Sequence, residues 1–240
     1  MLFPPEAYVR YKGSLLPPYR IRFNSADHQI DDAYLNSSIS EAERVVKALT
    51  YTPDQLIVDI GCGQGRLAIG LLRRFPDARY LGLDVSERSI KWCRTYLEQR
   101  HPSYKFQYLD VLNARYNPTG KPVSPGFRLP VPNGAADVVY MWGVVTNMEP
   151  EHMPVYIAEI ARMLRAGGKA FCTANVEDDV PIATINPDNY VSFKCAAPLH
   201  IVRYEKRYFL SVFERVGLKM TGYVHHAVGN CQSEIYFIKE

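Results

Sequence analysis

The sequence predicts an α/β fold built around a doubly wound, mostly parallel sheet. Two observations support this prediction. From residue 56 onward, short apolar runs alternate with amphipathic segments, and a glycine-rich turn, Gly61-Cys62-Gly63-Gln64-Gly65, follows the first apolar run. Such alternation is typical of strand, helix and strand units laid into one parallel sheet.

The chain divides into an N-terminal arm or cap, residues 1–39, and a single domain, residues 40–240. The arm holds Pro4, Pro5, Pro17 and Pro18 and shows no sustained hydrophobic period, so we expect it to be extended. Ser40 and Glu43 form a capping box, and apolar residues then recur on one helical face as far as Leu49. This pattern predicts a helix that begins at Ser40.

The first half of the domain contains three predicted strands and two further helices. The first strand is apolar enough to be buried on both faces, and Ser86 is placed to cap the second of these helices. In chain order we expect a strand at 56–60, a helix at 67–75, a strand at 80–85, a helix from 87 to about 101 and a strand at 105–111.

In the second half, two insertions, residues 113–133 and 177–203, interrupt the alternation of strands and helices. The first contains five prolines and the second lacks a clear period, and long loops in compact domains are often functional. Around them we expect a strand at 136–142, a helix at 154–166 that stops at Gly167-Gly168, a strand at 169–174, a helix at 204–216, and strands at 218–224 and 234–238. The last two can pair as an antiparallel edge, which completes a Rossmann-like sheet of seven strands.

Composition excludes several classes of protein. The 240 residues are 47% hydrophobic and 22% charged, which suits one buried core and disfavours disorder. No apolar run is long enough to span a membrane, and the start lacks a signal peptide pattern. The five cysteines include no C-x-x-C pair, and the net charge is only +3. We therefore expect a cytoplasmic protein that does not bind nucleic acid.

The glycine turn and three aspartates indicate the kind of ligand. Asp59 precedes the turn, Asp84 ends the second strand and Asp110 ends the third. A carboxylate beside the turn repels a pyrophosphate and favours an ammonium group, while Asp84 can accept hydrogen bonds from ribose hydroxyls and Asp110 from an adenine amino group. Arg66 also stands where the dinucleotide fingerprint needs glycine. The pattern indicates a ligand with an ammonium, a ribose and a base but no phosphates.

With these motifs the sequence resembles the class I methyltransferases that use S-adenosylmethionine. The resemblance covers about residues 45–173 and is carried by five segments: Val58 to Leu67, Gly82 to Ser86, Leu109 to Val111, Ala136 to Val139, and Met163 to Gly168. It implies S-adenosylmethionine as cofactor, with Asp59 and Gly61 at its ammonium, Gly63 and Gly65 against its backbone, Asp84 on its ribose, and Asp110 with Val111 at its adenine. The same segments add Cys62, Arg66 and Val85 to the expected site, and Trp142 ends the fourth strand, where it would line the cofactor or acceptor cleft.

A narrower resemblance connects the chain with bacterial O-methyltransferases associated with sugar and polysaccharide biosynthesis. It is carried by Leu16-Pro17-Pro18 and Arg22-Phe23, by Tyr116 to Gly120, and by Val144 to Met148, although this chain has Asn147 where that group has histidine. It implies O-methylation of a hydroxyl on a sugar, glycan or other small-molecule acceptor. An N- or C-methyltransferase of a small metabolite and a non-catalytic cofactor-binding module stay open as alternatives, and so does a homodimer.

Three histidines are candidates for the general base that a hydroxyl acceptor requires. His152 ranks first because it follows the fourth strand, and His225 and His226 lie at the end of the sixth. Glu177, Asp178 and Asp179 follow the fifth strand and could hold Mg²⁺. A solvated acidic loop is the preferred interpretation of these carboxylates, so no metal ligand is assigned.

Overall fold

The computed structural model describes residues 8–22, 27–124 and 126–240. The chain forms two compact units, Met1–Leu109 and Asp110–Glu240. Three of the residues used in the sequence analysis, Pro4, Pro5 and Phe23, lie outside the described part of the chain, and so does Pro125 of the first insertion.

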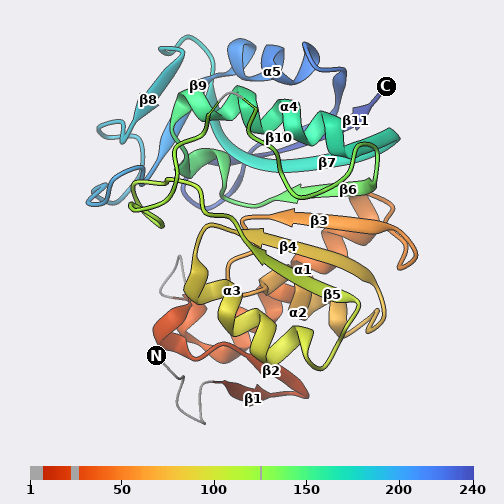
Figure 1. The fold of residues 1–240 in the computed structure, drawn as a ribbon. Helices are drawn as coiled ribbons and strands as arrows, with labels where there is room; N and C mark the ends of the chain where they lie inside the picture. The colour runs from red at the N-terminus through yellow and green to blue at the C-terminus, as the bar shows by residue number, and fades with distance from the viewer. Residues whose placement is uncertain (1–7, 23–26, 125) are drawn as a thin grey trace. The chain divides into compact units, whose positions relative to one another are not determined.

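The first unit contains a parallel sheet of three strands in the order β3-β4-β5. Its strands are β3 (Leu56–Ile60), β4 (Arg79–Asp84) and β5 (Tyr104–Tyr108). β3 has the predicted bounds, and its last four residues are buried. β5 is shorter than predicted, so Asp110 and Val111 lie beyond its end. Ahead of this sheet the arm forms a hairpin, β1 (Val9–Tyr11) and β2 (Ser14–Leu16), and two 3-10 turns, Tyr19–Ile21 and Asp27–Gln29 (Figure 1).

The helices of the first unit are α1 (Asp31–Ala48), α2 (Arg66–Leu72) and α3 (Glu87–Cys93), which continues as a π-helical turn, Arg94–Glu98. The Ser86 hydroxyl accepts a hydrogen bond from the Ser89 N–H at 3.3 Å, as the predicted cap requires. The predicted start of the first helix is wrong, because α1 begins at Asp31 and Ser40 lies inside it. Asp31 and Asp32 in the first turn are favoured there by the helix dipole.

Helices α1 and α2 approach each other closely at Gly70. A β-carbon on Gly70 would lie 1.9 Å from the Ser38 carbonyl oxygen and 3.0 Å from the Ala42 β-carbon. Next to this contact, the buried Glu41 of α1 pairs with Arg66 of α2. The two helices are therefore joined by backbone contact and by one buried ion pair.

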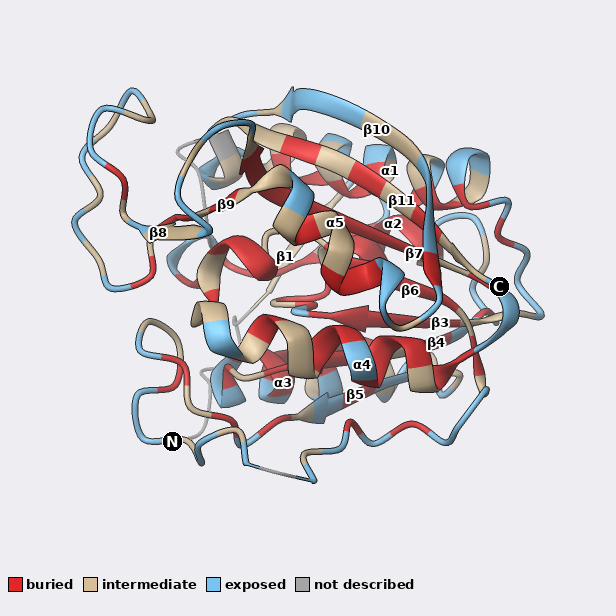
Figure 2. Cartoon of the chain, turned by 90° about the horizontal axis from the view of Figure 1, so that it is seen from above, coloured by how far each residue is buried: buried red, intermediate tan, exposed pale blue. Residues whose placement is uncertain are grey.

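The second unit contributes four strands of the main sheet: β6 (Ala136–Met141), β7 (Leu164–Glu177), β10 (Leu218–Val228) and β11 (Gln232–Lys239). β6 and β7 are parallel, β11 is antiparallel to β7, and β10 is antiparallel to β11. The main sheet thus has seven strands with an antiparallel edge, and the predicted fold class is confirmed. Figure 2 shows the contrast between the largely buried β7 and the exposed β10.

The remaining elements of the second unit are α4 (Met153–Met163), α5 (Lys206–Glu214), two 3-10 turns, Val145–Asn147 and Pro150–His152, and two short strands. The short strands, β8 (Ala183–Ile185) and β9 (Val202–Glu205), pair with each other, and β9 runs parallel to β7. The second insertion therefore contains strand structure that its aperiodic sequence did not predict. The first insertion has no helix or strand among its described residues.

The expected role of Gly167-Gly168 as a helix stop is wrong. Helix α4 ends at Met163, and β7 begins at Leu164. The pairing of β6 with β7 jumps from Ala136↔Leu164 to Val138↔Lys169. Gly167 has φ +71°, and a β-carbon on Gly168 would lie 2.9 Å from the Arg165 carbonyl oxygen. The two glycines therefore allow an irregular start of the strand.

Two further expectations concern membrane-spanning helices and the cysteines. Within the described ranges, no helix combines the length and apolar character needed to cross a membrane. All five cysteines are free thiols.

Gly70→Ala should destabilise the protein. The added methyl group meets a backbone carbonyl that cannot move without shifting α1, so we expect a loss of about 2 kcal/mol or more in the free energy of unfolding. Urea denaturation measures it. The control is Gly229→Ala, where nothing lies within 4 Å of the new β-carbon and the expected change is within about 0.5 kcal/mol. Equal stability of the two variants would contradict this account of the α1–α2 contact.

Candidate functional site

The glycine turn at the end of β3 is held in one conformation. Gly61, Gly63 and Gly65 have φ values of +76°, +52° and +74°, which disfavour other residues. The N–H groups of Gly61 and Cys62 both donate to the Leu83 carbonyl, at 2.7 and 3.1 Å. The turn is thereby fastened to the end of β4.

Asp84 lies against this turn, as the sequence predicts for residues at the ends of neighbouring parallel strands. Its Oδ2 accepts a hydrogen bond from the Gly63 N–H at 2.7 Å, and its Oδ1 accepts one from the Ser86 N–H at 2.7 Å. Burial raises the pKa of Asp84, and the two backbone N–H groups oppose that rise. The carboxylate therefore orders both the glycine turn and the turn that leads into α3.

Asp59 has a different environment from the one the sequence suggested. Its side chain is buried in β3, and its Oδ2 accepts a hydrogen bond from the Tyr80 hydroxyl at 2.6 Å. Burial raises the pKa of Asp59 to about 8, although the Tyr80 hydrogen bond lowers it. At neutral pH the protonated acid thus predominates, and a cation brought near it would favour the carboxylate.

Tyr80 was not among the site residues predicted from the sequence, although the pairing of β3 with β4 would have identified it. Asp59 pairs with Gly82 across β3 and β4. Tyr80 is two residues before Gly82, so alternation places it on the same face of the sheet as Asp59. Between them, Gly82 leaves no room for a side chain: a β-carbon there would lie 2.8 Å from the Cys62 Sγ and 2.8 Å from the Phe106 ring.

The other expected residues of the first unit have packing partners. The Arg66 guanidinium pairs with Glu41 and lies 3.1 Å from the His28 Nε2. Burial raises the pKa of Glu41, and Arg66 and Arg44 oppose that rise. Cys62 is buried within the turn, and Val85 is half-buried after β4. Arg66 therefore fastens α2 to α1.

Three expected cofactor residues belong to the second unit. Asp110 is exposed, and its Oδ2 lies 3.2 Å from the Lys121 Nζ. Val111 is buried, and its carbonyl accepts a hydrogen bond from the Asn117 side chain at 3.0 Å. Trp142 stacks with Tyr140 and Phe171, with ring centroids 6.5 and 6.1 Å apart. All three residues therefore have contacts within the second unit.

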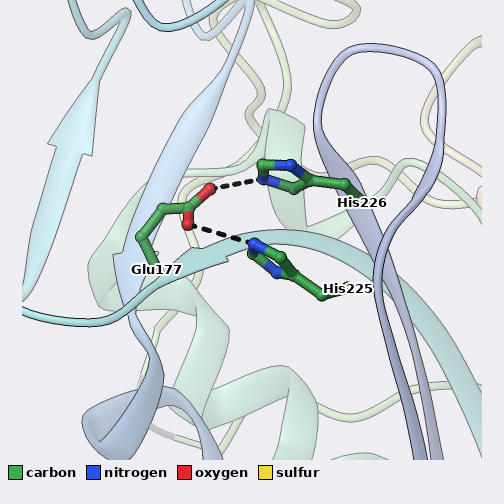
Figure 3. A group of neighbouring side chains, drawn as sticks. All are labelled: Glu177, His225 and His226. Atoms are coloured by element: carbon green, nitrogen blue, oxygen red, sulfur yellow. Dashed lines mark hydrogen bonds and ion pairs between the residues drawn. The ribbon is translucent and has the colours of Figure 1, made fainter.

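The candidate histidines are found in two places. His152 ends a 3-10 turn before α4, with its Nδ1 3.3 Å from Glu149 Oε2. His225 and His226 lie on β10 and both face Glu177 of β7 (Figure 3). The consecutive acids Glu177, Asp178 and Asp179 do not form one carboxylate cluster. Asp178 pairs with Lys206 at 3.4 Å, and Asp179 is exposed. The approach of Glu177 to two histidines was not predicted.

The middle of the chain matches one known protein family. The sequence model of the methyltransferase domain family matches residues 58–170. This segment begins in β3, includes the glycine turn and ends in β7.

Among curated proteins, the chain is similar to a malonyl-[acyl-carrier protein] O-methyltransferase of Xylella fastidiosa, with 27% identity over 67% of this chain and 50% of that protein. It is also similar to a fatty-acid O-methyltransferase of Mycolicibacterium smegmatis, with 30% identity over 52% of this chain and 39% of that protein. The chain thus spans half or less of the length of these two relatives.

Among solved structures, the fold resembles the magnesium protoporphyrin IX methyltransferase of Synechocystis PCC 6803, which was solved with bound S-adenosylmethionine. The TM-score is 0.56 at 14% identity, over 92% of this chain and 88% of that one. This likeness confirms the fold. The likeness to sugar and polysaccharide enzymes has no counterpart in these three proteins.

The buried Asp59 should make stability depend on pH. Its pKa is about 8 in the folded protein against 3.8 for the free side chain. The folded state then holds more protons between these values, so this contribution is fully present below pH 4 and is lost as pH rises toward 8. The loss amounts to up to about 1.4 kcal/mol per pH unit.

Asp59→Asn tests this, because asparagine can still accept from Tyr80 but does not ionise. We expect the variant to become progressively more stable relative to the wild type between pH 5 and pH 8, as measured by urea denaturation at each pH. The other titrating groups cancel in this difference. A constant difference in the free energy of unfolding would contradict the raised pKa of Asp59.

Proposed function

We propose that the chain transfers a methyl group from S-adenosylmethionine to an oxygen atom of a small-molecule acceptor. The sequence match and the fold both favour a class I S-adenosylmethionine-dependent methyltransferase domain. The observation that carries the proposal is the Asp84 carboxylate bonded to the Gly63 N–H of the glycine turn at 2.7 Å.

The residues around this turn suit the cofactor. Gly61 is exposed and Gly63 half-buried, so side chains do not cover the turn where it faces solvent. Each Asp84 oxygen already accepts one backbone N–H and keeps a lone pair with which it can accept from a ribose hydroxyl. Asp59, buried behind the turn, would ionise more readily beside a cation and in this way favours a cationic ligand.

When bound, S-adenosylmethionine supplies a methyl group on a positively charged sulfur. In this proposal Asp84 holds the ribose and orders the turn. The conformation of the turn is set before the ligand arrives, because its N–H groups are paired with β4. Positioning of this kind supplies much of the rate of a two-substrate displacement.

Carboxylic acids are the acceptors that we propose first. The two similar proteins described above, a malonyl-[acyl-carrier protein] O-methyltransferase and a fatty-acid O-methyltransferase, are both named for acids. A carboxylate is ionised at neutral pH, so its oxygen can attack the methyl carbon without a general base. A sugar or other hydroxyl acceptor, the expectation from the sequence, would instead require a base such as His152.

Asp84→Asn should weaken cofactor binding. The amide cannot accept at both positions, so we expect the dissociation constant of S-adenosylhomocysteine to rise about 10- to 100-fold. Isothermal calorimetry measures it, and thermal unfolding without ligand tests the fold. Asp77→Asn, an exposed aspartate before β4, is the matched control. Unchanged affinity in Asp84→Asn would contradict its proposed role.

The activity itself is tested with methyl-labelled S-adenosylmethionine and a panel of acceptors: fatty acids, dicarboxylic acids, acyl-carrier-protein thioesters, sugars, phenols and amines. We expect label in an acid, and its release as methanol under mild alkali, because esters hydrolyse there and ethers do not. Label that resists alkali in a sugar would support the hydroxyl expectation. Cofactor binding without transfer to any acceptor would favour a non-catalytic module.

His152→Gln separates the two kinds of oxygen acceptor. With a carboxylate acceptor we expect kcat within about threefold of the wild type, because no proton has to leave. A loss of about 100-fold or more would show that His152 acts as a general base and would contradict the carboxylate proposal.

A further inference from the structure

Glu177, His225 and His226 bring three metal-binding side chains together in the second unit (Figure 3). One ligand atom from each lies within 4.8 Å of the others. His226 Nε2 is 2.7 Å from Glu177 Oε1, and His225 Nε2 is 3.5 Å from Glu177 Oε2. The residues come from two strands, because Glu177 ends β7 and the histidines lie on β10.

Two consecutive histidines can face the same carboxylate only because β10 is irregular at this point. In a regular strand, neighbouring side chains point to opposite faces. Here the pairing of β10 with β11 jumps from Val224↔Glu234 to Val228↔Gln232, and His226 has φ +48°. Such bulges redirect side chains and are frequent beside functional sites. The two imidazoles consequently stack, with ring centroids 3.8 Å apart and planes 22° from parallel.

The outer contacts of the cluster leave the Nε2 atoms directed at Glu177. His225 Nδ1 lies 2.9 Å from the Tyr223 hydroxyl and 3.3 Å from the Ser233 hydroxyl. With its proton on Nδ1, His225 donates to one of these oxygens and has a lone pair on Nε2. Metal-ligating histidines are usually oriented by such a second hydrogen bond. Tyr190 from the second insertion donates to Glu177 Oε1 at 2.7 Å and so fixes the carboxylate.

The Glu177 carboxylate is held by the Tyr190 hydroxyl and by His226 Nε2, each 2.7 Å from Glu177 Oε1. The side chain is 20% exposed and the histidines 41% and 48%, so an ion can reach all three from solvent.

We propose that Glu177, His225 and His226 bind one divalent transition-metal ion, with Zn²⁺ the best match, at the junction of β7 and the β10–β11 hairpin. Two imidazoles and one carboxylate suit Zn²⁺ and its transition-metal neighbours, whereas Mg²⁺ and Ca²⁺ prefer oxygen ligands alone. The ion would replace the His226–Glu177 hydrogen bond and cross-link two strands. The site does not depend on the proposed methyl transfer.

Calorimetric titration of the untagged, chelator-treated full chain with ZnCl₂ tests the site. We expect one Zn²⁺ per chain with a dissociation constant of roughly 10 µM or tighter, a rise in the midpoint of thermal unfolding when Zn²⁺ is added, and no response to MgCl₂. Absence of binding at millimolar Zn²⁺ would overturn the proposal.

Three substitutions assign the ligands: Glu177→Gln, His225→Gln and His226→Gln. Each should raise the dissociation constant for Zn²⁺ at least about tenfold, because each removes one of three ligands. His101→Gln, which removes a half-buried histidine of the first unit, should bind Zn²⁺ like the wild type. Equal affinity in the three cluster variants would place the ion elsewhere and overturn the assignment.

A measurement on the wild type covers the case in which a variant does not fold. Diethyl pyrocarbonate modifies accessible imidazoles, and mass spectrometry of peptides locates the modified residues. Zn²⁺ should protect His225 and His226 while His101 reacts as before. Equal modification with and without Zn²⁺ would contradict the site.

Discussion

The first unit depends on one carboxylate that bridges two turns. Asp84 accepts the N–H of Gly63, in the turn after β3, and the N–H of Ser86, in the turn before α3. The three glycines of the first turn have left-handed conformations, and the Leu83 carbonyl accepts the N–H groups of Gly61 and Cys62. Because the backbone donors are paired within the protein, the turn keeps its shape without a ligand. A ligand can therefore bind without paying the entropic cost of ordering it.

Burial of acids in this unit has an electrostatic consequence. Glu41, Asp59 and Asp84 are all buried, and burial raises the pKa of each. Arg66 opposes the rise for Glu41, the Tyr80 hydroxyl for Asp59 and two backbone N–H groups for Asp84. The pKa of Asp59 nevertheless reaches about 8. A positively charged ligand at the turn would shift Asp59 toward its ionised form, which gives the site a preference for cations over neutral analogues.

The parts of the fold that sequence predicted best are those set by local pattern. The bounds of β3 follow from a short apolar run between polar turns, and the meeting of Asp84 with the glycine turn follows from parallel strands ending at one edge. The start of α1 was misjudged because Ser37 and Ser38, which hydrogen-bond to the Tyr34 carbonyl within the helix, obscured a buried face that begins at Tyr34 and Leu35. β8 and β9 depend on pairing with each other and with β7, between segments distant in sequence, and such pairing leaves little local signal.

The Glu177 cluster shows the same limit more sharply. Adjacent histidines on a strand are expected on opposite faces, so sequence alone argues against a shared ligand. The bulge turns both side chains toward the same carboxylate, but it requires a left-handed conformation at His226. That conformation costs a residue with a side chain about 1 kcal/mol or more. The 2.7 Å hydrogen bond to Glu177 and the stacked rings offset that strain. They also hold two imidazoles beside one carboxylate. A metal ion bound there would accept one lone pair from each ring and would pair with the charge of Glu177.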